Sequence, residues 1–169
     1  MNEKNDHYFS KFPEAELKVH TVSASLRKHL FLFKTATGVF SHQKIDLGTE
    51  ILIENMIIPE GPCVLLDMGC GYGPIGIALA YKSPESEVYM IDINERAVWC
   101  AKENVKINVP HRRDDVHVMS GNYFDALKKE TVMFDGIYMN PSIRRGRTQF
   151  LEMINQIPHY LKSGGIFQF

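Results

Sequence analysis

A glycine-rich loop directly after a short apolar segment limits the folds open to this chain more than any other feature. Residues 63–67 predict a buried strand, and four glycines follow within eight positions, at 69, 71, 73 and 76. Glycine lets the backbone turn sharply and approach a ligand because it has no Cβ. A plain strand-to-helix turn needs one such residue, so four of them indicate a ligand-binding loop.

The chain after residue 63 alternates between short apolar runs and helical patterns. This alternation indicates an α/β fold with a parallel sheet and helices on both faces. Ligands of such sheets bind beyond the carboxyl ends of the strands, so the residues after each strand form the candidate site. The predicted strands are 63–67, 87–92, 116–121, 134–140 and 166–169, and the predicted helices are 74–82, 94–109 and a segment around 150–157 that Pro158 breaks or bends.

Residues 1–60 predict a small accessory segment that precedes the main domain, which spans 61–169. Apolar and polar side chains alternate in two runs of this segment, as expected for half-buried strands. A threonine before a helical pattern and a proline after it indicate a short helix. The expected elements are a hairpin of strands 19–25 and 29–35, a loop at 38–41, and a helix with Thr49 as its N-cap that ends before Pro59.

Composition excludes several classes of protein. The chain has 169 residues, 44% hydrophobic and 23% charged, which is typical of one globular domain. The chain has no apolar run of about 20 residues, the length that a membrane span needs. Its first ten residues are polar and do not resemble a secretory signal. The formal net charge of −1 means that any contact with nucleic acid is local. Cys63, Cys70 and Cys100 form no C-x-x-C pair, so no metal site is expected and a reducing cytoplasm is the expected compartment.

Two classes of ligand compete for the glycine loop. Gly71-x-Gly73-x-x-Gly76 matches the dinucleotide fingerprint, with Asp92 at the expected distance. However, Asp67 opens the loop, and the resulting D-x-G-x-G-x-G pattern resembles the cofactor loop of class I S-adenosylmethionine methyltransferases. That cofactor has no pyrophosphate, and its methionyl ammonium group needs an acceptor, which Asp67 can supply. A nicotinamide-dependent oxidoreductase is therefore the less favoured alternative.

Further cofactor contacts are expected at the ends of the next two strands. Asp92 can accept hydrogen bonds from both ribose hydroxyls, and Ile93 would then pack against the adenine. The resemblance implies that Asn122 reads the adenine amino group, although Gly-Asn is also a common turn. The cofactor-binding residues expected in this half of the chain are Asp67, Gly69, Cys70, Gly71, Gly73, Asp92, Ile93, Asn122 and Tyr123.

A second motif follows the strand predicted at 134–140. Asn140-Pro141-Ser142-Ile143 resembles the N-P-P-[YFI] motif of methyltransferases that modify exocyclic or amide nitrogens. The lone pair of an aryl amine is delocalised, so acceptors on its protons, the Asn140 side-chain oxygen and the Pro141 carbonyl, favour a localised lone pair aimed at the methyl group. Asn140, Pro141 and Ile143 are therefore the expected catalytic residues. Ser142 replaces the usual second proline and loosens the loop, and Ile143 flanks a flat base without stacking on it.

Three arginines, Arg144, Arg145 and Arg147, follow this motif directly. Most such clusters are solvated basic loops. Beside a motif for amine methylation, these side chains are expected to hold the phosphate backbone of a substrate RNA.

The order of motifs along nearly the whole chain resembles one family. The segments at 7–10, 38–41, 44–49 and 140–146 are similar to the "methyltransferase small" domain family, whose best-known members are 16S ribosomal RNA guanine-N2 methyltransferases. The resemblance implies an S-adenosylmethionine-dependent N-methyltransferase acting on ribosomal RNA or the small ribosomal subunit, with the target base flipped into the site. It also implies that Phe40, Asp46 and Thr49 help to close over the cofactor.

Two departures from the family keep alternative functions open. Ser142 is one, and the end of the sequence at Phe169 is the other, because class I sheets continue beyond this strand with an antiparallel pair. We expect C-terminal strands to be missing and an apolar edge to be exposed, with the chain either a monomer or a homodimer. The alternatives are methylation of adenine N6 or of a protein glutamine, and a non-catalytic module that binds cofactor or RNA.

Overall fold

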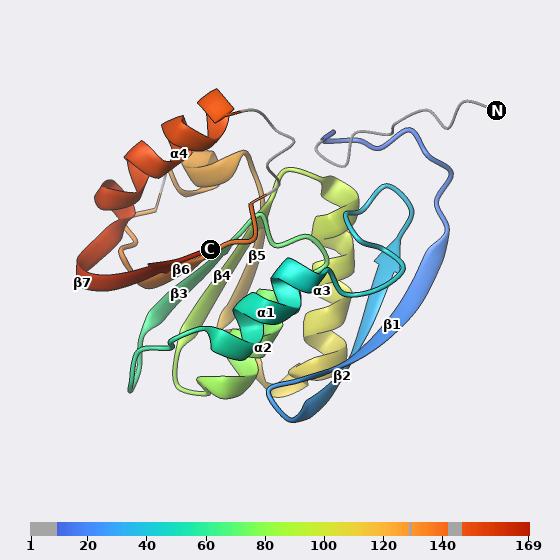
Figure 1. Cartoon of the computed structure of the whole chain (residues 1–169), viewed down its shortest axis with the longest axis horizontal. Helices are drawn as coiled ribbons and strands as arrows, with labels where there is room; N and C mark the ends of the chain where they lie inside the picture. The colour runs from blue at the N-terminus through green and yellow to red at the C-terminus, as the bar shows by residue number, and fades with distance from the viewer. Residues whose placement is uncertain (1–9, 129, 142–146) are drawn as a thin grey trace.

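The computed structural model describes residues 10–128, 130–141 and 147–169 (Figure 1). Within them, no helix is long and apolar enough to cross a membrane. In chain order the elements are β1 (Val19–Leu26), β2 (His29–Ala36), α1 (Leu47–Asn55), β3 (Val64–Met68), α2 (Pro74–Lys82), β4 (Glu87–Asp92), α3 (Glu95–Asn108), η1 (Pro110–Arg112), β5 (Val116–Ser120), η2 (Tyr123–Leu127), β6 (Phe134–Tyr138), α4 (Arg147–Tyr160) and β7 (Leu161–Gln168), where η is a short 3-10 helix.

The central sheet has the strand order β5-β4-β3-β6-β7, and every neighbouring pair is parallel. The predicted parallel α/β sheet is therefore confirmed. Successive strands move outward from β3 to β5, and the chain then returns to place β6 on the other side of β3. A reversal of this kind opens a crevice at the carboxyl ends of the central strands, where such sheets bind their ligands.

Helices cover both faces of the sheet and define two hydrophobic cores (Figure 1). Side chains of α1, α2 and α3 pack on one face together with the inner face of the β1–β2 hairpin. Side chains of η2 and α4 pack on the other face. The middle strand β3 is buried from both sides, with Leu65, Leu66 and Met68 almost fully excluded from solvent. Burial on both faces explains why this strand reads as a continuous apolar run.

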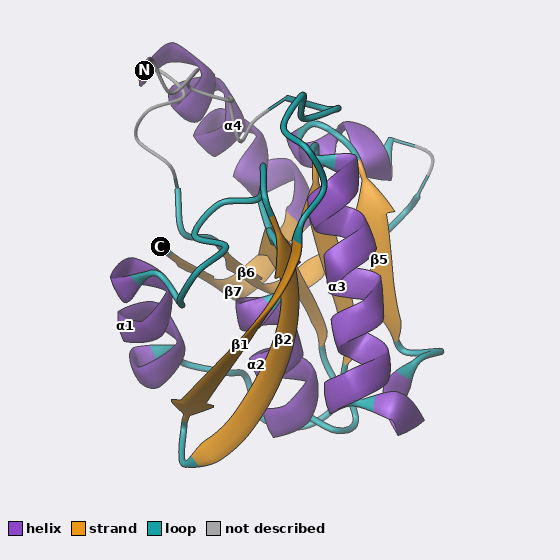
Figure 2. Cartoon of the chain, turned by 90° about the vertical axis from the view of Figure 1, so that its right-hand side faces the viewer, coloured by secondary structure: helices purple, strands orange, loops and turns teal. Residues whose placement is uncertain are grey.

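Two asparagines of α3 fasten the β1–β2 hairpin, whose strand β2 runs beside this helix in Figure 2. The Asn108 amide accepts from the Leu32 N–H (3.0 Å) and donates to the Leu32 carbonyl (2.9 Å). The Asn104 amide makes the same pair of bonds to Lys34, at 2.6 and 2.7 Å. Four residues along a helix and two along a strand both span about 6–7 Å, so the two amides match alternate residues of β2 like a neighbouring strand. Asn104 also donates to the Tyr72 carbonyl in the glycine loop at 2.8 Å.

Several boundaries differ from the sequence-based predictions. Strand β6 ends at Tyr138, two residues before the predicted end, and three further differences have a structural cause. The cap of α1 is Asp46 rather than Thr49, because the Asp46 carboxylate accepts from the Thr49 N–H at 3.1 Å. Helix α4 includes Pro158 and ends at Tyr160, so the proline does not end it at once. Strand β7 begins at Leu161, five residues before the predicted start, since an irregularity in its pairing with β6 accommodates the glycines between.

Asn104→Ala is expected to lower the free energy of unfolding by about 1–3 kcal/mol, because it leaves buried backbone groups of β2 and of the glycine loop without partners. Urea unfolding of the variant and the wild type measures this difference. Asn55→Ala is the matched control, because Asn55 is exposed and donates only to the Ile51 carbonyl of its own helix. Equal losses for the two variants would contradict a fastening role for Asn104.

Candidate functional site

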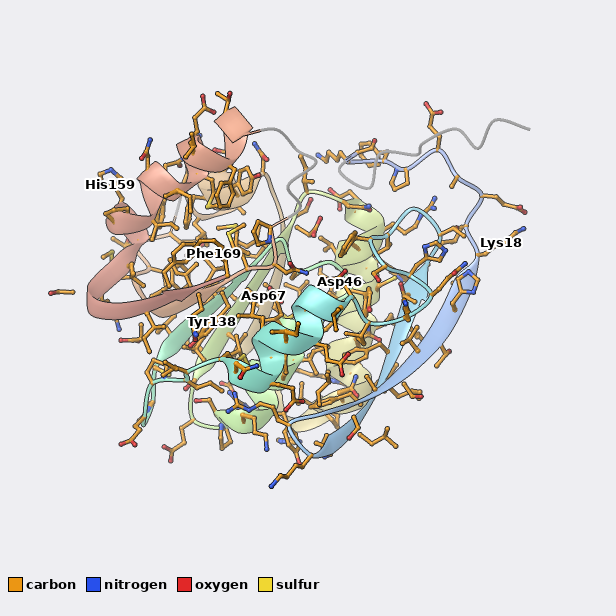
Figure 3. The ribbon with its side chains drawn as sticks, in the orientation of Figure 1. Lys18, Asp46, Asp67, Tyr138, His159 and Phe169 are labelled. Atoms are coloured by element: carbon orange, nitrogen blue, oxygen red, sulfur yellow. The ribbon has the colours of Figure 1, made fainter. Side chains whose placement is uncertain are left out.

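A pocket lies at the carboxyl ends of β5, β4, β3 and β6, where the sheet topology places the ligand site. Its walls come from both parts of the chain, since the loop after β2 and the start of α1 face the strand ends. Asp46, labelled in Figure 3, marks the start of α1. The lining residues are Phe40, Ser41, Asp46, Thr49, Met68, Gly69, Cys70, Gly71, Tyr72, Pro74, Ile75, Ile91, Asp92, Ile93, Asn94, Ala97, Gly121, Tyr123, Met139, Asn140, Pro141 and Phe150.

The glycine loop after β3 has a conformation that requires its glycines. Gly69, Gly71 and Gly73 have φ values of 72°, 57° and 96°, in the left-handed region that side chains with a Cβ disfavour. At Gly73 a Cβ would also lie 2.5 Å from the Met90 methyl carbon. At Gly69 and Gly71 a Cβ would meet no atom within 4 Å, because both residues border the pocket. The loop is thus tight against the protein on one side and open on the other.

The backbone donors of this loop are largely bonded within the protein. The Gly69 and Cys70 N–H groups donate to the Ile91 carbonyl at 2.8 and 2.9 Å. The Gly71 N–H donates to the Asp92 carboxylate at 2.8 Å, and the Gly73 N–H donates to the Cys70 carbonyl. A dinucleotide loop uses such donors to bind pyrophosphate. The bonding therefore disfavours the dinucleotide interpretation of the glycine pattern.

Asp67 is fully buried beneath the loop rather than at the pocket surface. Its Oδ2 accepts from the Gly76 N–H at 2.8 Å, and no protein group in the described part of the chain bonds its Oδ1. Burial raises the pKa of Asp67 from 3.8 to about 7, the Gly76 bond opposes the rise, and the charge of Asp92 adds to it. A buried carboxyl oxygen without a partner is costly, so this position fits a cationic or donor group that arrives from outside.

Asp92 and Asn94 join the strand end to the N-terminal segment. Asp92 accepts from Gly71 N–H at 2.8 Å and from Asn94 N–H at 2.9 Å. Asn94 caps α3, as predicted, and its side-chain NH₂ donates to the Gly38 carbonyl at 2.7 Å. The loop that carries Phe40 is thereby fixed over the end of β4. A carboxylate can accept more than two hydrogen bonds, so Asp92 is able to receive ribose hydroxyls as well.

Arg96, the second residue of α3, bonds the same region. Its guanidinium donates to the carbonyls of Thr37 (2.6 Å), Pro13 (3.3 Å) and Ala15 (3.0 Å). At Gly38 a Cβ would lie 2.6 Å from the Pro13 side chain. The start of α3 therefore anchors both the segment around residue 13 and the loop after β2.

The amide of Asn140 is held by two residues from the N-terminal segment. Its Nδ2 donates to the Asp46 carboxylate at 2.7 Å and to the Thr49 hydroxyl at 2.8 Å. Because a carboxylate only accepts hydrogen bonds, the NH₂ end of the amide must face Asp46. The Asn140 Oδ1 is therefore the end of the amide that can accept a hydrogen bond from a ligand.

The structure brings most of the predicted site residues to this pocket. Phe40, Asp46, Thr49, Gly69, Cys70, Gly71, Asp92, Ile93, Tyr123, Asn140 and Pro141 line it. Asp67 and Gly73 lie behind the loop, and the exposed Asn122 is not among the lining residues. Ile143, Arg144 and Arg145 lie outside the described residues, and Arg147 is described only as the first residue of α4.

Sequence reasoning missed Tyr72 and Phe150. Tyr72 lies inside the glycine motif, where attention went to the glycines, and its ring packs edge-on against Phe33. Burial raises the pKa of the Tyr72 hydroxyl, and the nearby Asp46 carboxylate raises it further, so the group stays a neutral donor. Phe150 belongs to the apolar pattern predicted for the helix around 150–157, and it lines the pocket. Its place in the first turn of the helix that follows the Asn140 motif is the signal that could have indicated this.

Comparison with solved structures shows which known fold this chain shares. The T. thermophilus 16S rRNA N2 G1207 methyltransferase RsmC, solved with AdoMet and guanosine, superposes with a TM-score of 0.74 at 24% identity, covering 92% of this chain and 42% of that one. A precorrin-6y C5,15-methyltransferase from Geobacter metallireducens superposes with a TM-score of 0.59 at 19% identity. These likenesses give the fold of the S-adenosylmethionine-dependent methyltransferases.

Residues 31–169 match the methyltransferase small domain, and the chain belongs to this family. The predicted family and class of enzyme, an S-adenosylmethionine-dependent methyltransferase, are thus confirmed.

Curated relatives agree with this assignment. The uncharacterized protein YbxB of Bacillus subtilis is 34% identical over 161 residues, 95% of this chain and 78% of that protein. The ribosomal RNA small subunit methyltransferase C of Photorhabdus laumondii is 31% identical over 79% of this chain, and the large subunit methyltransferase G of Shewanella denitrificans is 30% identical over 86%. The chain spans 38% of the length of each of these two enzymes.

The raised pKa of Asp67 predicts a specific dependence of stability on pH. Between pH 3.8 and about 7 the folded chain binds the Asp67 proton more tightly than the unfolded chain, so the contribution of Asp67 to stability falls as pH rises through this window. The free energy of unfolding of the wild type, relative to that of Asp67→Asn, is expected to fall by up to about 4 kcal/mol between pH 3.8 and about 7. Above this window the difference is expected to stay constant. Urea unfolding at a series of pH values, without cofactor, measures this difference. Asp114→Asn, at an exposed site, is the control, and a difference constant with pH would contradict the burial effect.

Proposed function

We propose that this chain transfers a methyl group from S-adenosylmethionine to the exocyclic amine of a nucleobase, with guanine N2 of small-subunit ribosomal RNA as the favoured target. The observation that carries the proposal is the fixed amide of Asn140. Its NH₂ end is bonded to Asp46 and Thr49, so its oxygen can serve an incoming amine in the pocket formed by the glycine loop. The cytoplasm, where ribosomal subunits assemble, is the proposed compartment.

The residues around the pocket fit S-adenosylmethionine. The unpartnered Oδ1 of Asp67 supplies a buried negative position behind the loop, and the open space at Gly69 and Gly71 lets a ligand approach the backbone. Asp92 and Ile93 stand at the end of β4, where they would hold the ribose and the adenine. The bound cofactor supplies an electrophilic methyl group on sulfur.

The protein's own groups would align the acceptor. Asn140 Oδ1 would accept a hydrogen bond from one N–H of the amine, and we assign the Pro141 carbonyl to the other N–H, an arrangement that favours a localised lone pair on the nitrogen. As the nitrogen gains its bond to the methyl carbon, the bond between that carbon and sulfur breaks, the sulfonium becomes a neutral thioether, and the nitrogen releases one proton to solvent. Phe150 lines the same pocket as Asn140 and Pro141 and offers a flat apolar surface to a base. Alignment and electrostatics are sufficient roles for the protein, because the methyl group is already strongly electrophilic.

The assignment of ribosomal RNA as substrate is supported by the named relatives, which act on the small and the large subunit. Guanine is favoured because the superposed RsmC structure holds guanosine and its name specifies N2 of a guanine. The arginines after the Asn140 motif are assigned to the RNA backbone.

Asn140→Ala is expected to lower kcat for methyl transfer by about 100-fold or more while the Kd for S-adenosylmethionine changes less than about threefold, because the residue contacts the acceptor and not the cofactor. Isothermal titration and a radiolabel assay measure the two quantities. Asn55→Ala, at an exposed site on α1, is the matched control. Full activity of Asn140→Ala would overturn the catalytic assignment.

Identification of the methylated product tests the substrate. Methyl-labelled S-adenosylmethionine is incubated with ribosomal subunits that lack their own methylation, and label is counted after nuclease and protease digestion. N2-methylguanosine is the expected product. N6-methyladenosine would show that adenine is the target, and label in the protein fraction would show that a protein is. Cofactor binding without any label would favour a non-catalytic binding module.

A further inference from the structure

We propose that Asp46, together with Thr49, locks the amide of Asn140 so that the site selects an acceptor group that donates hydrogen bonds. This inference rests on the proposed function and assigns Asp46 a role other than cofactor closure. Asp46 and Thr49 are positioning residues here, because they act through Asn140.

An asparagine side chain has a donor end and an acceptor end of nearly the same shape, so its neighbours decide which end faces a ligand. The Asp46 carboxylate lies 2.7 Å from Nδ2 and cannot donate, so rotating the amide would set oxygen against oxygen. The Thr49 hydroxyl accepts from the same nitrogen at 2.8 Å. With both Nδ2 protons in these bonds, rotation would break two hydrogen bonds, one of them to a charged group.

Asp46 is itself held in place by the helix that it caps. The same Oδ2 accepts from the Thr49 N–H at 3.1 Å, and the Asp46 carbonyl accepts from the Glu50 N–H at 2.9 Å. The amino end of a helix carries a partial positive charge, which stabilises the carboxylate. The orientation of Asn140 is therefore set by the rigid first turn of α1 and not by a mobile side chain.

A fixed Asn140 oxygen discriminates between chemical groups. An amine donates to it, whereas a carbonyl or an unprotonated ring nitrogen would place lone pair against lone pair. A side chain at the exposed Gly48 would crowd this oxygen, because a Cβ there would lie 3.2 Å from Oδ1 and 3.1 Å from the Asp46 carboxylate. Glycine at this position thus leaves the space beside the oxygen unfilled.

The double variant Asp46→Ser and Thr49→Val tests the lock while it preserves the helix. Serine is a good N-cap but is too short to reach Asn140, and valine keeps the shape of threonine without its hydroxyl. Asp114→Ser, an exposed substitution of the same type, is the control. We expect kcat/KM to fall about 10- to 100-fold, the factor that loss of a hydrogen bond to a charged group produces. The Kd for S-adenosylmethionine is expected to stay within threefold of the wild-type value.

The orientation itself is read by NMR, independently of any substrate. The side-chain NH₂ signals of Asn140, identified by their loss in Asn140→Ser, are expected to exchange slowly with solvent in the wild type and rapidly in the double variant. Selectivity is read from the affinities for guanosine and for inosine, which lacks the amine. Adenosine and purine riboside replace this pair if the product is N6-methyladenosine. A wild-type preference of about tenfold for the amine should approach onefold in the double variant.

The outcomes separate the two proposals. If the wild type transfers no methyl group to any amine, the proposed function fails, and the exchange rates still decide whether Asp46 fixes the amide. If the wild type is active but the double variant keeps its rate and its amine preference, the inference about Asp46 is overturned. Rapid exchange of the wild-type NH₂ protons would overturn it as well.

Gly48→Ala tests whether the space beside Oδ1 is needed. A methyl group there would crowd Oδ1 and the Asp46 carboxylate, so acceptor KM is expected to increase about tenfold. The melting temperature, measured alongside, shows whether the fold is kept, and an unchanged KM would contradict a need for this space.

Discussion

The pocket depends on a direct connection between the loop after β3 and the end of β4. Two successive N–H groups, of Gly69 and Cys70, converge on one carbonyl, that of Ile91. The third, of Gly71, bonds the Asp92 carboxylate at the last position of β4. The loop can bend this far because its backbone enters the left-handed region. Adjacent parallel strands are thus joined at their carboxyl ends, and the pocket wall formed by the glycine loop is directly bonded to the sheet.

Helix α3 holds the N-terminal segment in place beside the pocket. At its start, Asn94 and Arg96 bond the carbonyls of the loop after β2. Nearer its end, Asn104 and Asn108 pair with β2 in place of a strand. Asn104 also bonds the Tyr72 carbonyl in the glycine loop, so one buried side chain connects the hairpin, the helix and the loop that lines the pocket. The position of the hairpin and the shape of the pocket therefore depend on the same contacts.

Much of this arrangement could be predicted from the sequence because it is encoded locally. Strand runs, the glycine motif and the cap at Asn94 are set by neighbours along the chain, and the structure confirms them. The contacts that complete the site join residues far apart. Asp46 was expected near the cofactor, yet it also caps α1 and bonds Asn140, 94 positions away. Phe150 reads as a core residue because its helical periodicity is the same whether it faces a core or a pocket.

The bond between Asp46 and Asn140 crosses from the first third of the chain to its last part. The bonds of the glycine loop to Ile91 and Asp92 lie within the middle of the sequence and involve no residue of α1. On the proposed mechanism, these bonds shape the pocket, whereas the acceptor is oriented only through the contact between the two distant segments. Displacement of α1 would therefore remove the orientation of the acceptor and leave the bonds of the glycine loop in place.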